Sequence, residues 1–254
     1  MTTGNELGLL RRHEIEQGIG VPDWGVGAYE ALKQDMLGEE SPFPCIFGVE
    51  GFRADTLCYS FIGEPTEEQA LFQLRDQLIR YTEGYRQLGR NTSLVAFFQP
   101  MQEIQTMDQY ERIFWDVIHF LHKHDPQAWP RQIPHDTGSH LWEFCFNGEP
   151  IFVVCNTPAH EIRKSRKSKT FMITFQPLWV FDELTGERGL RAVQAVRQRL
   201  ASYDKVGAHP ALGLYGEEDK LEWKQYFLKD DNSSPTQCPF HALHKEKKAE
   251  GKGA

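Results

Sequence analysis

The sequence lacks an apolar run long enough to cross a bilayer. Its first residues, MTTGNELGLLRRHEIEQG, hold no apolar segment ahead of a small-residue cleavage site. We therefore expect neither a membrane span nor a secretory leader. Lys and Arg number 28 against 36 Asp and Glu, so the net charge is −8, which disfavours general nucleic-acid binding. These absences predict a cytoplasmic protein with no membrane partner and no nucleic-acid partner.

Familiar cofactor and nucleophile motifs are also missing. The chain has no Gly-x-Gly-x-x-Gly, no Walker loop and no Gly-x-Ser-x-Gly elbow, so nucleotide binding and ordinary serine-hydrolase chemistry have no support. The five cysteines are odd in number and form no Cys-x-x-Cys pair, which argues against a disulfide framework and against a structural zinc site. They are Cys45, Cys58, Cys145, Cys155 and Cys238.

What is present is a globular composition, with 40% hydrophobic and 25% charged residues over 254 positions. Apolar spacing and turn residues predict strands and helices in mixed order. We expect strands at 43–48, 56–62, 93–98, 141–146, 151–155 and 170–175, and helices at 28–37, 66–81, 108–124, 189–203 and within 217–228. Segments 43–48 and 56–62 are predicted to pair as a hairpin, and Asn147-Gly148 predicts a tight turn.

This order of elements predicts an α+β fold. We expect a single domain with a mostly antiparallel sheet flanked by helices, followed by a loop-rich C-terminal part. The predicted boundaries are an N-terminal extension at 1–41, the α+β domain at 42–244 and a disordered tail at 245–254, which is rich in Lys.

A basic segment interrupts the acidic chain. Five cations fall between 163 and 169 with no acid among them, and Arg163 and Arg166 follow closely on His160. Such a cluster suits an anion: a phosphate, a carboxylate or the propionates of a cofactor. The alternative is a solvated loop between two strands.

Two cysteines stand in unusual surroundings. Cys238 begins Cys-Pro-Phe-His after a polar loop, and its thiolate could hold a soft metal or a haem iron. Pro42 and Pro44 fix the backbone ahead of Cys45 and could aim its sulfur in the same way. For both cysteines the alternative is a buried structural thiol.

Two further patterns leave alternatives open. His119 and His122 lie three apart on one predicted helix face, where they could share a metal or simply face water. Trp142 begins a run of aromatic residues spaced two apart on a predicted strand, with Phe144 and Phe146. Core packing explains such a run, but a flat macrocycle would also fit against it.

The chain resembles the YqcI/YcgG-like family between about Pro42 and Phe240. The matching pieces are FPCIFG (43–48), FW…LHKHD (114–125), WEFCFNGEPIFVV (142–154), NTPAHEIRKSR (156–166), TFQPLWVFDEL (174–184), VRQRLASYD (196–204), EWKQYFL (222–228) and CPF (238–240). Some members of that family are haem-dependent N-oxygenases, which hydroxylate a guanidino nitrogen of arginine-like compounds in the guanitoxin and D-cycloserine pathways. Many other members have no assigned activity.

The resemblance implies haem b as the cofactor and a small guanidino or amino compound as the substrate. An external electron donor or peroxide would be needed, because no flavin or nicotinamide site is visible. A thiolate ligand favours oxygen activation at haem iron, so the candidate axial ligands, in order, are Cys238, His160 and Cys45.

Arg163 and Arg166 would bind the propionates, and Trp142 would pack on the macrocycle. No catalytic residue can be assigned. The alternative function is a haem- or small-anion-binding protein without turnover, and a non-haem metal enzyme using His119 and His122 is a third possibility.

Overall fold

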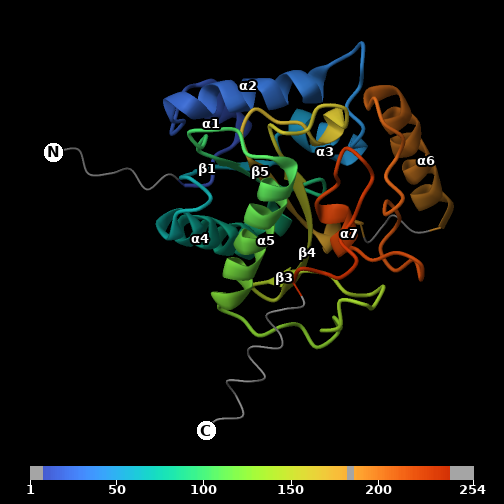
Figure 1. Cartoon of the computed structure of the whole chain (residues 1–254). Coiled ribbons are helices and arrows are strands. Elements are labelled where there is room, and N and C mark those ends of the chain that lie inside the picture. The colour runs from blue at the N-terminus through green and yellow to red at the C-terminus, as the bar shows by residue number, and fades with distance from the viewer. Residues whose placement is uncertain (1–7, 182–185, 241–254) are drawn as a thin grey trace, which may run out of the picture.

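One mixed β-sheet forms the centre of the molecule in a computed structural model, which describes residues 8–181 and 186–240 (Figure 1). Its strand order is β1-β2-β5-β4-β3. Three of the four neighbouring pairs are antiparallel, and only β1 and β2 run parallel. The predicted α+β fold with a mostly antiparallel sheet is thus confirmed. The strands are β1 (Cys58–Ile62), β2 (Leu94–Phe98), β3 (Cys145–Phe146), β4 (Glu149–Asn156) and β5 (Met172–Pro177).

Helices cover both faces of this sheet. Figure 1 shows α2 and α3 at the top of the view, α4 and α5 below, and α6 at one side. The helices are α1 (Arg12–Glu16), α2 (Asp23–Leu37), α3 (Ile46–Arg53), α4 (Glu68–Gly84), α5 (Met107–Lys123), α6 (Gly186–Tyr203) and α7 (Trp223–Tyr226), with 3-10 turns η1 (Tyr85–Gln87), η2 (Lys164–Arg166) and η3 (Leu178–Phe181). Among the helices of the described ranges, none has both the length and the apolar character that a bilayer span requires.

Alternation along the strands separates two apolar cores. On β5, Ile173 and Phe175 point into the core that packs under α4 and α5. Met172 lies in the second core, together with Tyr29 of α2 and Phe52 of α3. Because successive strand residues face opposite sides, β1, β2 and β5 each contribute to both cores.

Helix α5 shows why the amphipathic prediction succeeded. Thr106 accepts a hydrogen bond from Gln109 N at 3.3 Å, and the Gln109 side chain bonds back to Thr106 N at 2.8 Å, which closes a capping box. Its buried residues recur at three- and four-residue spacing and face the first core: Tyr110, Phe114, Val117, Ile118 and Leu121.

The predicted hairpin between residues 43 and 62 is wrong. Residues Ile46–Arg53 form helix α3, in which Val49 and Phe52 are buried three residues apart. The Cys45 sulfur accepts from Gly48 N at 3.3 Å and caps this helix. Strand β1 then pairs in parallel with β2 across α4 instead of folding back on 43–48. A short apolar run with two glycines carries no period that separates strand from helix.

Other local predictions were confirmed only in part. Of the predicted strand 141–146 only Cys145–Phe146 pairs, as β3. The helix expected at 66–81 is α4, which begins at Glu68 after the N-cap residue Glu67 and ends at Gly84. The Asn147-Gly148 turn is confirmed, with φ angles of 52° and 76°, which glycine and asparagine adopt most readily.

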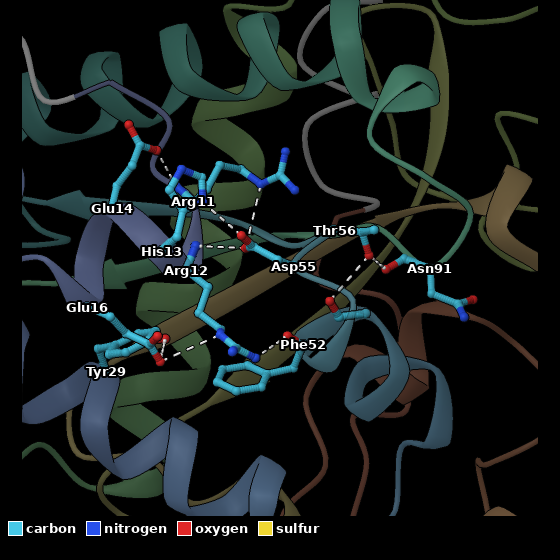
Figure 2. A network of polar contacts seen from close by, with 11 residues as sticks. Arg11, Arg12, His13, Glu14, Glu16, Tyr29, Phe52, Asp55, Thr56 and Asn91 are labelled. Carbon is cyan, nitrogen blue, oxygen red and sulfur yellow. Dashed lines mark hydrogen bonds and ion pairs between the residues drawn. The ribbon is translucent and has the colours of Figure 1, made fainter.

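A polar network joins α1 to the end of α3 (Figure 2). Asp55 accepts from Arg12 N at 2.9 Å and lies 2.8 Å from His13 Nδ1, and the Arg12 side chain donates to Phe52 O at 3.1 Å. Leu10, just before α1, forms a β-bridge with Tyr59 of β1. The described part of residues 1–41 thus packs on the same sheet as the rest, whereas the predicted tail at 245–254 lies outside the described residues.

Helix α3 lies close enough to the Asn91 backbone to give a test of this packing. A Cβ added at Gly51 would come within 2.2 Å of Asn91 O. We expect Gly51→Ala to lower the free energy of unfolding by about 2–4 kcal/mol, because the backbone cannot yield to such overlap cheaply. Gly84→Ala, where a Cβ meets nothing within 4 Å, serves as the control in urea unfolding and should be neutral or slightly stabilising. Equal stability of both variants would contradict the position of α3.

Candidate functional site

A cavity of about 580 Å³ lies on the α2 and α3 side of the sheet. Its floor is formed by the strand residues that alternate with those facing the first core: Val154 and Asn156 on β4, and Thr174 and Gln176 on β5. Its walls come from α2, from the start of α3, from α6 and from the segment that contains α7. This volume falls within the roughly 300–1,000 Å³ typical of small-molecule sites.

The two arginines of the basic segment both line this cavity, but they differ in their partners. Arg163 is fully buried. Its Nε donates to Lys229 O at 3.0 Å, its Nη2 donates to Asn232 Oδ1, and its Nη1 lies 3.8 Å from Asp204 Oδ2. Arg163 therefore ties the basic segment to the C-terminal part of the chain.

Arg166 lacks such partners. Its Nε is buried without a hydrogen bond, and no carboxylate forms an ion pair with it within the described chain. Burial, with the neighbouring Arg163 charge, lowers the pKa of Arg166 to about 10. It is still a cation at neutral pH, and its charge also acts on the thiols of Cys45 and Cys155. A guanidinium in this state is suited to bind an anion.

Three hydrogen-bond systems hold the loop that carries these arginines. Asp230 accepts from the backbone N–H groups of Glu161, Ile162 and Arg163 at 2.8–3.1 Å. Burial opposes ionisation of Asp230, but these donors outweigh it and lower the pKa of the carboxyl. Asp204 accepts from both the N–H and the hydroxyl of Ser165, at 2.7 and 2.8 Å. The third system centres on His160.

His160 is buried with both ring nitrogens engaged. Nε2 lies 2.9 Å from Leu228 O, which can only accept, so Nε2 carries the proton. Nδ1 lies 2.9 Å from the Thr157 hydroxyl and accepts from it. Burial lowers the pKa of His160 to about 4, so the ring is neutral at neutral pH. It does not line the cavity.

Cys45 lies at the cavity wall as the N-cap of α3. Burial raises the pKa of the Cys45 thiol, while the Gly48 N–H and the Arg166 charge act in the opposite direction. The sulfur is thus protonated in the free chain, yet it is surrounded by groups that stabilise a thiolate. A metal that coordinates such a thiol removes its proton.

The C-terminal wall contributes an acid that sequence reasoning missed. Glu222 is 3% exposed and lines the cavity. Its Oε2 accepts from Gln225 Nε2 at 2.9 Å, and its Oε1 is buried with no hydrogen-bond partner. Burial, with the Glu217 carboxylate, raises the pKa of Glu222 to about 8. The only sequence signal was its position at the start of EWKQYFL, which gave it no role.

A second acid lies behind Glu222. Glu143 is fully buried, accepts from the Tyr226 hydroxyl with Oε1, and has no partner for Oε2. Burial, with the nearby Glu222 carboxyl, raises the pKa of Glu143 well above its ordinary value. Burial therefore favours the neutral form of Glu143.

Three of the predicted site residues, Trp142, Cys238 and His160, do not line the cavity. Trp142 and Cys238 are buried in the first core, on the α4 and α5 side, where Phe240 packs 5.5 Å from the Trp142 ring. The structure therefore brings together Cys45, Arg163 and Arg166, and places Trp142, Cys238 and His160 elsewhere. Among the described residues, no group of three His, Cys, Asp or Glu side chains could hold a metal ion, and His119 and His122 are not part of one.

The chain is an α+β protein with a mixed sheet and a cavity lined by a thiol and two arginines, and the comparisons identify its family. The chain belongs to the YqcI/YcgG family, whose model matches residues 32–241. It is 42% identical to "Uncharacterized protein YqcI" and 41% identical to "Uncharacterized protein YcgG", both of Bacillus subtilis (strain 168). These matches cover 87% and 88% of this chain and 89% and 90% of those proteins.

A more distant relative carries a functional name. The chain is 29% identical to "Putative N(omega)-hydroxy-L-arginine synthase DcsA" of Streptomyces lavendulae, over 94% of this chain and 91% of that protein. None of the known solved structures matches the chain.

The buried Glu222 predicts a specific dependence of stability on pH. Its folded pKa lies above its unfolded value, so the folded state binds the extra proton between about pH 4.5 and 8, and stability falls as the pH rises through this window. At pH 8 we expect the free energy of unfolding of Glu222→Gln to exceed that of the unmodified chain by about 1–3 kcal/mol. At pH 5 we expect the two values to differ little. Urea unfolding at the two pH values measures this. A constant difference would show that Glu222 is ionised in the folded protein.

Proposed function

We propose that this chain is a haem-dependent N-oxygenase, which hydroxylates a nitrogen of a guanidino or amino compound. The relative named as an N-hydroxyarginine synthase matches almost the whole of both chains, which favours chemistry at a guanidino nitrogen. The observation that carries the cofactor is local: a thiol at a helix N-terminus and a partnerless guanidinium share one largely apolar cavity.

The residues around the cavity fit a haem. Aromatic side chains of Phe47, Phe152 and Phe181 supply flat apolar walls for a macrocycle. Arg166, whose buried Nε lacks a partner, would bind a propionate, and Lys167 and Lys169 on the same wall add positive charge. Arg163 is held by the C-terminal segment, so its contribution would be the charge and the Nη1 group only.

Cys45 is the residue that we propose would hold the haem iron. It lines the cavity, and the Gly48 N–H donates to its sulfur, as is suitable for a thiolate that must remain ionised. Cys238, the first choice from the sequence, lies in the core on the other face of the sheet. His160, the second choice, would first have to give up its bond to Leu228 O.

A thiolate-ligated haem supplies oxygen activation when it is bound. The reaction joins one oxygen atom to the substrate nitrogen and reduces the other to water, with two electrons and two protons from an external donor. Peroxide can replace dioxygen and the donor together. The chain itself positions the substrate in the cavity, and its apolar walls keep water away from the reacting nitrogen.

The ferrous carbonyl spectrum of the haem-loaded protein tests the ligand. We expect a strongly red-shifted band in the unmodified chain, because a thiolate donates electron density to the iron. Cys45→Ala should lose this band, whereas Cys238→Ala should keep it. Loss in Cys238→Ala with retention in Cys45→Ala would reverse the assignment, and a globin-like band abolished by His160→Ala would mean a histidine ligand.

Arg166 provides the test of the propionate site. Arg166→Ala should weaken haem retention by about 10- to 100-fold, the value of a charge-assisted hydrogen bond in a partly desolvated site. Lys164→Ala is the control, because Lys164 lies in the same turn but is exposed and does not line the cavity. Haem dissociation rates measured by transfer to an acceptor protein give the comparison. Equal rates in both variants would remove Arg166 from the site.

A haem-binding protein without turnover is the second candidate, favoured by the Arg166 guanidinium alone, which would retain an anion whether or not chemistry follows. The two functions separate in one assay. The haem-loaded protein is incubated with L-arginine, dioxygen and a reductant, and mass spectrometry measures a product heavier by one oxygen atom. A Soret band without such product, across guanidino and amino substrates, favours the carrier.

A further inference from the structure

Glu222, the acid in the cavity wall, has no role in the function proposed above. Glu222 is the N-cap residue of α7, which lies against β4 (Figure 1). Helix α7 is fixed on several sides: Trp223 Nε1 donates to Thr137 O at 3.0 Å, and the Tyr226 hydroxyl bonds to Glu143 and to Phe144 N. A carboxylate on so rigid a support is preorganised for a ligand.

Hydrogen bonds fix one oxygen of Glu222 and leave the other available. Gln225 donates to Oε2 at 2.9 Å, and its own Oε1 accepts from Gly213 N at 3.3 Å, so the amide cannot swing away without losing a second bond. Oε1 has no partner although it is buried. Buried polar atoms without partners are uncommon in folded proteins, and one at a cavity wall indicates a group that the cavity receives.

Other acids of the fold are compensated in a way that Glu222 is not. Asp204 accepts two hydrogen bonds from Ser165 and lies near Arg163, and Asp230 accepts three backbone N–H groups. Burial and the Glu217 carboxylate raise the pKa of Glu222, and Glu222 in turn raises the pKa values of Glu143, Tyr215 and Tyr226. Among the described residues Glu222 forms no ion pair, so a cationic ligand in the cavity would supply the charge that favours its ionised form.

We propose that Glu222 binds the cationic nitrogen group of the substrate through its free Oε1 and that it thereby selects a guanidinium over an uncharged isostere. The inference rests on the proposed function, because it concerns the substrate of the same cavity. A planar guanidinium presents several N–H donors in one plane and is weakly hydrated, so it tolerates an apolar cavity better than an ammonium does. Glu143 lies behind Glu222, and burial raises the pKa of Glu143, which favours its neutral form over a competing charge.

Binding of this cation is linked to a proton. Glu222 holds a proton in the free protein at neutral pH, since its pKa is raised to about 8, and a guanidinium favours the ionised form. Arginine binding at pH 7 should therefore release a proton into the buffer. L-citrulline has the same shape with a neutral ureido group, so it should bind more weakly and release none.

Titration calorimetry of the full-length chain with L-arginine and L-citrulline, in two buffers of different ionisation enthalpy, tests the proposal. We expect the unmodified protein to prefer arginine and to release a proton, and Glu222→Gln to lose about 10- to 100-fold in arginine affinity with no proton release. Glu218→Gln, which changes an exposed acid near α7, should behave like the unmodified chain. Equal affinity for the two ligands, or unchanged arginine binding in Glu222→Gln, would overturn the proposal.

Two measurements keep the result separate from the cofactor and from folding. Haem content is determined by absorption for every sample, so a chain that binds arginine without haem fails the oxygenase proposal and not this one. Circular dichroism reports the fold. If Glu222→Gln does not fold, Glu222→Asp keeps the charge but shortens the side chain, and it should lower arginine affinity while keeping the preference over citrulline. A variant with no such loss also overturns the role of Glu222.

Discussion

The buried guanidinium of Arg163 is the constraint on which the cavity depends. It joins two segments far apart in the chain, since its donors reach Lys229 O and Asn232 while the carboxylate of Asp230 holds the backbone of the arginine's own loop. A buried charge is tolerated only where it is paired and hydrogen-bonded, so this arrangement fixes the register of the C-terminal segment against residues 157–166. With that register set, Arg166 and the α7 wall both reach one cavity.

The cavity is lined by both a basic and an acidic side chain. Arg166 contributes a cation whose buried Nε has no hydrogen bond, and Glu222 contributes an acid whose pKa is raised by burial and by the Glu217 carboxylate. Both groups lower the stability of the protein when no ligand is bound, as groups selected for binding commonly do. The rest of the fold offsets this cost through two apolar cores on opposite sides of one sheet.

Residue patterns predicted the fold better than the site. The amphipathic stripe of α5 and the Asn147-Gly148 turn are local signals, and both were confirmed. Helix α3 was missed because a single sulfur caps it and its apolar run is too short to show a period. Residues of the basic segment do line the cavity, and the local excess of positive charge that singled this segment out can be seen in the sequence itself. No pattern could reveal that Cys238 and Cys45 lie on opposite faces of the sheet, or that Glu222 lacks a cation, because both depend on contacts between distant segments.

The walls of the cavity come from nearly the whole length of the chain, from Ala28 on α2 to Leu228 after α7. During synthesis the first wall leaves the ribosome long before the last, and no earlier fragment contains both Cys45 and the segment that fixes Arg163. Domains gain their long-range contacts only when the participating segments have all been made. The complete cavity can therefore form only after the chain has been synthesised as far as Leu228, and a ligand bound there adds its binding free energy to the stability of every element that lines the cavity.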